Sequence, residues 1–345
     1  FQKAIQYHER HLQVAKEVGD KAGETRAYEN LGIAYQRLGD FHKAIEYHER
    51  YLEIAKEMGD RDEEGRANEN LGIAYHNLGN FQKAIQYHER HLQIAKEVVD
   101  KAGETRAYEN LGIAYQRSGD FQKAIEYHER HLEIAKEVGD KDEEGRAYGN
   151  LGIAYQGLRD FNKAIEYHER HLEIAKEVGD KDEEERAYGS LGFAYHNLGN
   201  FQKAIQYHER HLQIAKEVGD KAGETRAYGN LGIAYSRLGD FHKAIQYHER
   251  HLQIAKEAGD KDDEGRAYRN LGFAYHNLSN FQKAIQYHER HLEIAKEAGD
   301  KDEEGRAYEN LGIAYDNLGD FQKAIQYHER HLQVAKEVGD KAGET

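Results

Sequence analysis

Apolar and polar positions along the chain follow one pattern that returns every 40 residues. A phenylalanine marks the same place in each copy, from Phe1 to Phe321. In residues 21–60, small and apolar residues recur at spacings of three and four, first over residues 27–38 and again over residues 41–55. This spacing predicts one apolar stripe on each of two helices. A fixed period of this size predicts a stack of helical units, each in contact with its neighbours, rather than one globular core.

Short polar turns separate the predicted helices. Gly39 suits the left-handed position that follows a helix, and Asp40 suits the residue that caps the next one. The chain has no proline, so neither helix is interrupted by one. We therefore expect helix–turn–helix units in a chain that looks like a fragment. The expected domains are a lone second helix over residues 1–20, eight units over residues 21–340 (units 1 to 8 below), and the start of a further unit over residues 341–345.

The composition fits a slender helical stack. Apolar residues make up 38% of the chain and charged residues 33%, but 25 Tyr and 11 Phe argue against disorder. The formal net charge of −15 argues against nucleic acid or an anionic membrane as partner. No apolar run approaches the roughly 18 residues that a membrane helix needs, and no signal peptide is visible. Because there is no cysteine, disulfides are excluded. We expect a cytoplasmic protein without membrane insertion.

One glycine lies inside the predicted first helix of every unit, from Gly32 to Gly312. Glycine at such a position costs about 1 kcal/mol relative to alanine, and we expect it to let this helix cross closely over Ala44. The pattern Y-x2-L-G-x2-Y … A is made by Tyr28, Leu31, Gly32, Tyr35 and Ala44. It resembles the tetratricopeptide repeat, whose pattern is W-x2-L-G-x2-Y … A-x3-F … P. The resemblance implies an all-α, right-handed superhelical solenoid whose first helices line the concave surface.

Three positions depart from that family pattern. Tyr28 replaces Trp, His48 stands where Phe is expected, and Lys56 replaces Pro. The 40-residue period and the phrases YHERHLEIAKEVGDK and RAYENLGIAY resemble the G-protein-signalling-modulator class (LGN/Pins). That resemblance implies a cortical adaptor of G-protein and spindle-orientation machinery, located at the cell cortex. Ile33 stands where LGN-type repeats often carry Asn.

Pairs of histidines three residues apart recur in the second helices, as in His128 and His131. Imidazoles at this spacing could share a metal ion, but no third ligand column accompanies them. Both columns coincide with packing positions of the tetratricopeptide pattern, so we predict packing and expect neither a metal nor another cofactor. No column pairs Ser with His and Asp, and the carboxylates gather at helix starts, where the helix dipole favours them. We expect a non-enzymatic protein.

A further set of columns lies on the exposed face of the first helix. In unit 1 these are Arg26, Asn30 and Ile33, whose spacings of four and three place them on one face. Substitutions between copies gather beside them, whereas packing positions hardly change. We predict that this face binds a ligand; the alternatives are a tolerant surface and arginines paired with acidic neighbours. The candidate residues are Arg106, Asn110, Ile113, Arg146, Asn150, Ile153, Arg186, Phe193, Arg226, Asn230, Ile233, Arg266, Asn270 and Phe273.

These columns favour a scaffold that binds a peptide or helix of a partner protein. Arginines would pair with ligand carboxylates, asparagines would bind its backbone, and the Ile/Phe column would form an apolar floor. We expect an acidic, partly apolar peptide and a locally basic groove for it. The alternatives are an LGN/Pins-like adaptor and a sensor array of a larger signalling protein with a nucleotide-binding or protease-like domain. Both ends repeat the interior sequence, so end-to-end self-association is also predicted.

Overall fold

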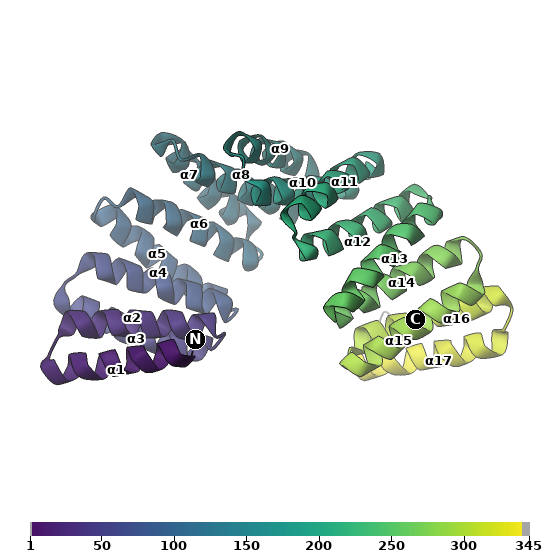
Figure 1. Cartoon of the computed structure of the whole chain (residues 1–345), viewed down its shortest axis with the longest axis horizontal. Coiled ribbons are helices and arrows are strands. Elements are labelled where there is room, and N and C mark those ends of the chain that lie inside the picture. The colour runs from purple at the N-terminus through teal and green to yellow at the C-terminus, as the bar shows by residue number, and fades with distance from the viewer. Residues whose placement is uncertain (1, 340–345) are drawn as a thin grey trace. The chain divides into compact units, whose positions relative to one another are not determined.

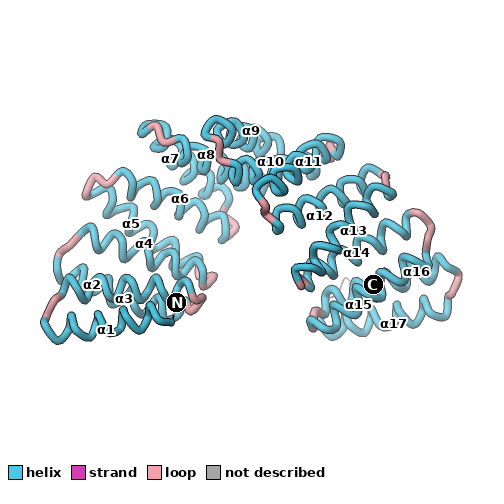
Figure 2. The backbone as a smooth tube through the Cα atoms, viewed as in Figure 1, coloured by secondary structure: helices cyan, strands magenta, loops and turns pink. Residues whose placement is uncertain are grey.

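A computed structural model of the chain describes residues 2–339, which form α-helices joined by short turns (Figures 1 and 2). The predicted helix–turn–helix units are confirmed: α1 is the lone second helix, and each even-numbered helix is a first helix followed by its second helix. Residues 341–345, the predicted start of a further unit, lie outside the described residues. The helices are α1 (Gln2–Val18), α2 (Lys21–Arg37), α3 (Phe41–Met58), α4 (Arg61–Asn77), α5 (Phe81–Glu97), α6 (Lys101–Arg117), α7 (Phe121–Val138), α8 (Lys141–Gly157), α9 (Phe161–Val178), α10 (Lys181–Asn197), α11 (Phe201–Val218), α12 (Lys221–Leu238), α13 (Phe241–Ala258), α14 (Lys261–Asn277), α15 (Phe281–Ala298), α16 (Lys301–Leu318) and α17 (Phe321–Val338).

The chain divides after Gly179 into two compact parts, an N-terminal part with α1–α9 and a C-terminal part with α10–α17. Within each part, every helix packs against the next one along the chain. First helices of successive units also contact each other: α2 with α4, α4 with α6, α6 with α8, α10 with α12, and α12 with α14. Among the described residues, successive second helices do not approach each other to this extent. The first helices therefore form the more closely packed layer of each part.

The turns follow the predicted chemistry. The side chain of Asp40 accepts a hydrogen bond from the backbone N–H of Lys43 at 3.2 Å and so caps α3. At the other end of α3, Gly59 adopts the left-handed conformation with φ 70°. Because one helix ends and the next begins within two or three residues, successive helices are held side by side.

Three turns carry a residue other than glycine in the left-handed conformation: Val99 (φ 60°), Arg159 (φ 61°) and Ser279 (φ 57°). A Cβ atom disfavours this conformation by about 1–2 kcal/mol, while glycine makes the unfolded chain somewhat more flexible. We therefore expect Val99→Gly, Arg159→Gly and Ser279→Gly each to stabilise the protein by about 0.5–1 kcal/mol, measured as the shift of the urea unfolding midpoint. Gly139→Ala, at φ 75°, is the reverse control and should destabilise. A glycine variant that unfolds at lower urea than the parent chain would contradict this.

The glycine inside each first helix is required by a histidine. An ideal Cβ atom on Gly152 would lie 2.3 Å from Cε1 of His168, closer than real atoms approach. The same relation holds from Gly32 with His48 to Gly312 with His328. We expected the glycine to let the first helix cross closely over Ala44. The residue that it contacts is instead the histidine of the second helix, through its imidazole ring. The leucine beside each of these glycines, from Leu31 to Leu311, is fully buried in the core.

The last described helix keeps an apolar face uncovered. Phe321 and Ile325 of α17 are 63% and 59% exposed, whereas Ile285, at the position equivalent to Ile325, is 6% exposed. Both α1 and α17 are second helices, and second helices in the interior pack on first helices. End-to-end self-association stays a prediction.

Candidate functional site

The predicted columns lie on the free face of the first helices, called the first-helix face below. The five candidate arginines have 44–67% of their side chains exposed: Arg106, Arg146, Arg186, Arg226 and Arg266. About one turn further along the same helices lie the half-buried asparagines Asn110, Asn150, Asn230 and Asn270. Both kinds of side chain can therefore reach a ligand on this face without unfolding the helix.

The Ile/Phe column is the apolar component of the first-helix face. Phe193, Ile233 and Phe273 occupy the same position of α10, α12 and α14, and they are 49%, 37% and 52% exposed. Because these three helices contact each other in turn, their exposed side chains form a row within the C-terminal part. In the N-terminal part, Ile153 is 40% exposed and Ile113 is half-buried. A repeated apolar row outside the core is typical of an interaction surface.

All five candidate arginines have a carboxylate partner. The Nε of Arg106 lies 3.1 Å from Oε1 of Glu69 on the preceding first helix, and Arg266 lies 2.6 Å from Asp263 on its own helix. Carboxylates therefore lie among the arginines of this face, and the locally basic groove stays a prediction. The other pairs are Arg146 with Glu143, Arg186 with Glu183, and Arg226 with Asp220.

Beneath these ion pairs lies the second histidine column, which contains the histidine at the position of His131. The Nε2–H of His131 donates to Glu143 at 3.0 Å, and the Nε2–H of His291 donates to Glu303 at 2.9 Å. Both imidazoles are buried, with side chains 0% and 2% exposed. Since Glu143 also contacts Arg146, one carboxylate connects a buried imidazole to an exposed guanidinium.

The acidic partner of this histidine comes from one of two places. Usually it is the third residue of the next unit, as with Glu143 and Glu303. At three junctions that residue is a glycine: Gly23, Gly103 or Gly223. At the last two of them, the partner belongs to the histidine's own unit. The Nε2-to-carboxylate distances are 3.8 Å for His91 with Glu69 and 3.1 Å for His211 with Glu185. We did not predict this exchange, although Glu185, which stands where the other units carry glycine or threonine, indicates it in one case.

The first histidine column, at the position of His128, is also buried. Burial and the neighbouring His131 lower the pKa of His128 to about 3, and burial likewise lowers the pKa of His168 to about 3. These imidazoles are therefore neutral near neutral pH. In the part of the chain that the structure describes, no cluster of histidine and carboxylate side chains has the geometry to hold a metal ion.

Two equivalent pockets open on the first-helix face. The larger has a volume of about 320 Å³, and Gly65, Ile94 and Ala95 line it below the arginines Arg66 and Arg106 of two successive units. Its counterpart has a volume of about 280 Å³, and it is lined in the same way by Gly265, Ile294, Ala295 and Arg266. Each pocket thus places an apolar floor next to a candidate arginine.

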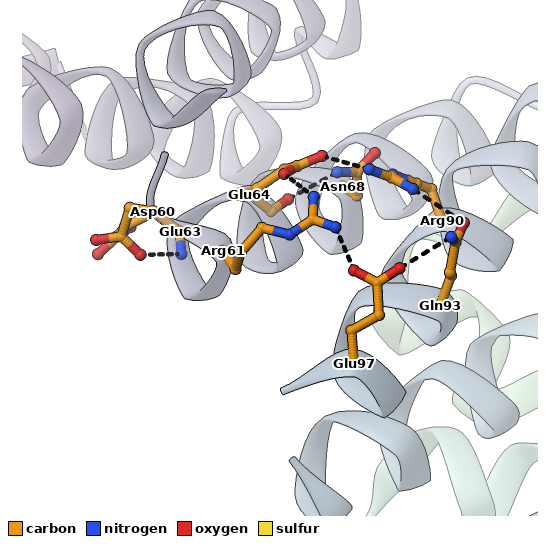
Figure 3. A network of polar contacts seen from close by, with 8 residues as sticks. All are labelled: Asp60, Arg61, Glu63, Glu64, Asn68, Arg90, Gln93 and Glu97. Atoms are coloured by element: carbon orange, nitrogen blue, oxygen red, sulfur yellow. Dashed lines mark hydrogen bonds and ion pairs between the residues drawn. The ribbon is translucent and has the colours of Figure 1, made fainter. Parts of the chain in front are cut away.

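A network of ion pairs fixes the edge of the larger pocket (Figure 3). Arg61, which lines this pocket, contacts both Glu64 of its own helix and Glu97 of α5. Glu64 also lies 3.0 Å from Arg90. Burial raises the pKa of Glu64, but hydrogen bonds from Arg61 and Arg90 outweigh burial, so the pKa is lowered. The charged carboxylate therefore holds α4 to α5 beside the pocket.

A larger and more polar hollow lies on the side of the second helices. It has a volume of about 740 Å³ and lies among α11, α12 and α13, where Tyr228, Tyr235 and Tyr247 line it. Tyr235 and Tyr247 stack with their ring centres 5.3 Å apart, and the Lys243 ammonium lies 4.9 Å from the centre of the Tyr235 ring. Its tyrosines are thus engaged with each other and with lysine, so this hollow serves as a control surface for binding experiments.

Among the described residues, no helix is long and apolar enough to cross a lipid bilayer. No curated protein matches the sequence. The chain is similar in structure to the Signal Transduction ATPase with Numerous Domains (STAND) protein with a tetratricopeptide repeat sensor from Pyrococcus horikoshii, at 20% identity and a TM-score of 0.71, over 98% of this chain and 54% of that one. The chain thus spans about half of that protein.

Two further solved structures share the fold. The apo form of the quorum sensor NprR from B. thuringiensis is 16% identical with a TM-score of 0.63, over 96% of this chain and 98% of that one. BtubC from P. vanneervenii is 25% identical with a TM-score of 0.57, over 64% and 92%. The profile of the tetratricopeptide repeat matches residues 1–57, 63–137, 103–177, 183–257 and 263–337. The chain therefore belongs to the tetratricopeptide repeat family.

Proposed function

We propose that this chain is a non-enzymatic scaffold that binds a peptide or a helix of a partner protein on its first-helix face. The observation that carries the proposal is the row of Phe193, Ile233 and Phe273, which exposes apolar surface at one position of three contacting helices. An extended or helical ligand can bury such a row while its backbone meets the amides of Asn230 and Asn270. The contacts would add up along the face.

The ligand that fits best carries both acidic and apolar side chains. Arg146 is 45% exposed, and exposed ion pairs contribute only about 0–1 kcal/mol, so its pair with Glu143 is easily exchanged. When a ligand carboxylate takes the place of Glu143 on Arg146, Glu143 keeps its hydrogen bond to His131. The buried histidine thus offsets part of the cost of freeing the arginine for an acidic ligand.

The test is a randomised peptide library selected on the intact chain. We expect enriched peptides that combine acidic and aliphatic or aromatic residues, and we expect Phe193→Ser with Phe273→Ser to weaken their binding about tenfold or more, because apolar contact is lost. Replacing Arg146, Arg186 and Arg226 by Ala should also weaken binding. Fluorescence anisotropy with a labelled enriched peptide measures both effects.

The matched control lies on the opposite side of the helices. Glu249→Ala and Gln246→Ala change the hollow among α11, α12 and α13 and should leave peptide affinity unchanged. If these two changes weaken binding while the Phe and Arg variants do not, the ligand lies on the second-helix side and the assignment is wrong.

A second candidate function is that of a sensor array in a larger signalling protein with a nucleotide-binding or protease-like domain. The structural similarity to a STAND protein with a tetratricopeptide repeat sensor favours it. An LGN/Pins-like adaptor at the cell cortex is the finer alternative that the sequence phrases suggest. A phosphate-binding loop encoded in the same reading frame would favour the sensor, and Gα-binding motifs there would favour the adaptor.

A further inference from the structure

We propose that this chain associates with further copies of itself through the two ends of α6, where Val99 of one copy enters a hollow beside Ser118 of another. Val99 lies just before α6 and Ser118 just after it. The helix is about 25 Å long, and the turns at its two ends lie at opposite edges of the N-terminal part (Figure 2). Both residues are departures from the repeat that occur once in the chain. The proposal does not depend on the peptide-binding function.

Val99 is an exposed apolar residue that the fold does not require. Every other copy of this position is glycine, from Gly19 to Gly339. Val99 adopts the left-handed conformation there, with φ 60°, and it is 75% exposed. A β-branched residue disfavours this conformation, so the valine is kept at a cost to folding. A strained residue that offers apolar surface is a candidate for contact with another molecule.

At the other end of α6, a serine replaces a large apolar residue. Ser118 stands where every other unit carries leucine, and its hydroxyl donates to the backbone carbonyl of Tyr115 at 2.8 Å. A hollow of about 600 Å³ lies here between the turns of units 2 and 3, and Leu78, Phe81, Arg117 and Ser118 are among its lining residues. Leucine is larger than serine, so the substitution enlarges the space beside Leu78 and Phe81. The hollow therefore offers apolar walls to a valine side chain.

The two ends of α6 also carry opposite charges that are not neutralised. Asp100 follows Val99 and is exposed, and its side chain makes no capping hydrogen bond, unlike that of Asp40. Arg117 at the hollow is exposed, and within residues 2–339 it forms no ion pair. The arginines of the first-helix face differ, because each has a carboxylate partner of its own. Asp100 and Arg117 can therefore form a charge-assisted contact between copies without breaking an existing pair.

The contact joins two different surfaces, so every docked copy leaves one surface of each kind free. Such a contact extends into an open chain of molecules unless the rotation between copies closes a ring. One valine and one ion pair bury little surface, so we expect weak association. The net charge of −15 opposes it further, because copies of the chain repel each other.

Static light scattering of the intact chain over a range of concentrations tests the proposal, at about 0.15 M salt to screen the repulsion. We expect dimers and larger species of the parent chain as the concentration rises. Val99→Gly should weaken this association about tenfold or more, because the inserted side chain is lost, although the same change should stabilise the fold. Arg117→Glu should weaken it similarly, because two carboxylates then meet. Val138→Ala is the matched control, since Val138 is 63% exposed beside the next such turn and should leave association unchanged.

A mixture of the two weakened variants identifies the surfaces that meet. Val99→Gly keeps the hollow and Arg117→Glu keeps the valine, so one copy of each can form the contact once. We expect equimolar mixing to give dimers that do not grow further, and mixing without dimers would overturn the proposal. A parent chain that stays monomeric at about 1 mM, where even weak contacts are populated, would also overturn it. Association that persists in Val99→Gly but is lost on Ile325→Ser would place the contact on the exposed face of α17 instead.

Discussion

We expect mild acid to unfold this protein over a narrow range, as the pH falls from about 6.5 to 5. The upper limit of this range is the unperturbed pKa of histidine. Seven histidines of the first histidine column are buried, and burial lowers their pKa values to about 4 for His48 and about 3 for His88, His128, His168, His208, His248 and His288. In the unfolded chain they take up protons that the folded chain excludes. Their stabilisation is therefore complete above the unfolded pKa and is lost as the pH falls below it.

The size of the effect follows from linkage. Each such histidine lowers the free energy of unfolding by about 1.4 kcal/mol for every pH unit below the pKa that it has in the unfolded chain. At pH 5 this amounts to about 2 kcal/mol per histidine. With almost one of these histidines in every unit, the summed cost at pH 5 is of the order of the whole stability of a typical protein. Loss of the helical circular dichroism signal with falling pH is the measurement.

A matched variant tests whether the histidines cause the transition. His128→Leu with His168→Leu replaces two of the seven titrating rings by side chains of similar volume that bind no proton. The variant should unfold at lower pH and less steeply. Full helicity of the parent chain at pH 4.5 would show that the buried rings either ionise in place or do not control stability.

Gly152→Ala should destabilise the protein by roughly 1–3 kcal/mol, even though alanine favours the helix by about 1 kcal/mol. The added methyl group would lie 2.3 Å from the ring of His168, which has no exposed surface. That ring cannot move aside easily, because the Gln156 amide donates to its Nε2 at 3.0 Å. Urea unfolding of the two proteins measures the difference.

The clash can be separated from other effects of the substitution. His168→Ala removes the ring and leaves a cavity, and in the double variant the methyl group added by Gly152→Ala has space. We expect the double variant to be more stable than the sum of the two single changes predicts, by about 1 kcal/mol or more. Gly305→Ala is the control, because its Cβ would meet Val334 at an ordinary 3.5 Å. Equal destabilisation by Gly152→Ala and Gly305→Ala would contradict the steric explanation.

The sequence could predict the features that depend on neighbours along the chain. Helix ends follow from local residues such as Asp40 and Gly59, and the exposure of Phe193 and Phe273 follows from their spacing on one helix. The pairing of Arg106 with Glu69 could not be predicted in this way, because the two residues are 37 positions apart and meet only through the packing of α4 on α6.

The reason for the internal glycine was also only partly accessible. Its recurrence indicated a close contact, but the choice between Ala44 and His48 as the contacting residue depends on how the two helices of a unit cross. The exchange of acidic partners could have been found from the eight copies in one case. Gly223 follows a unit with Glu185, where the other units carry glycine or threonine, whereas Glu69 before Gly103 has counterparts in Glu29 and Glu109 that precede no such glycine.

This exchange means that the units are not interchangeable building blocks. Tandem duplication of residues 61–100 would keep a carboxylate beside every new histidine, because that segment contains both Glu63 and Glu69. Duplication of residues 221–260 would instead place Gly223 of the second copy directly after the first copy, which carries Gly229 rather than a glutamate. His251 of the first copy would then lose the acidic partner that the next unit supplies in the present chain. Growth of such a chain by unequal crossing-over is therefore restricted to certain junctions, and the order of the units is inherited together with their number.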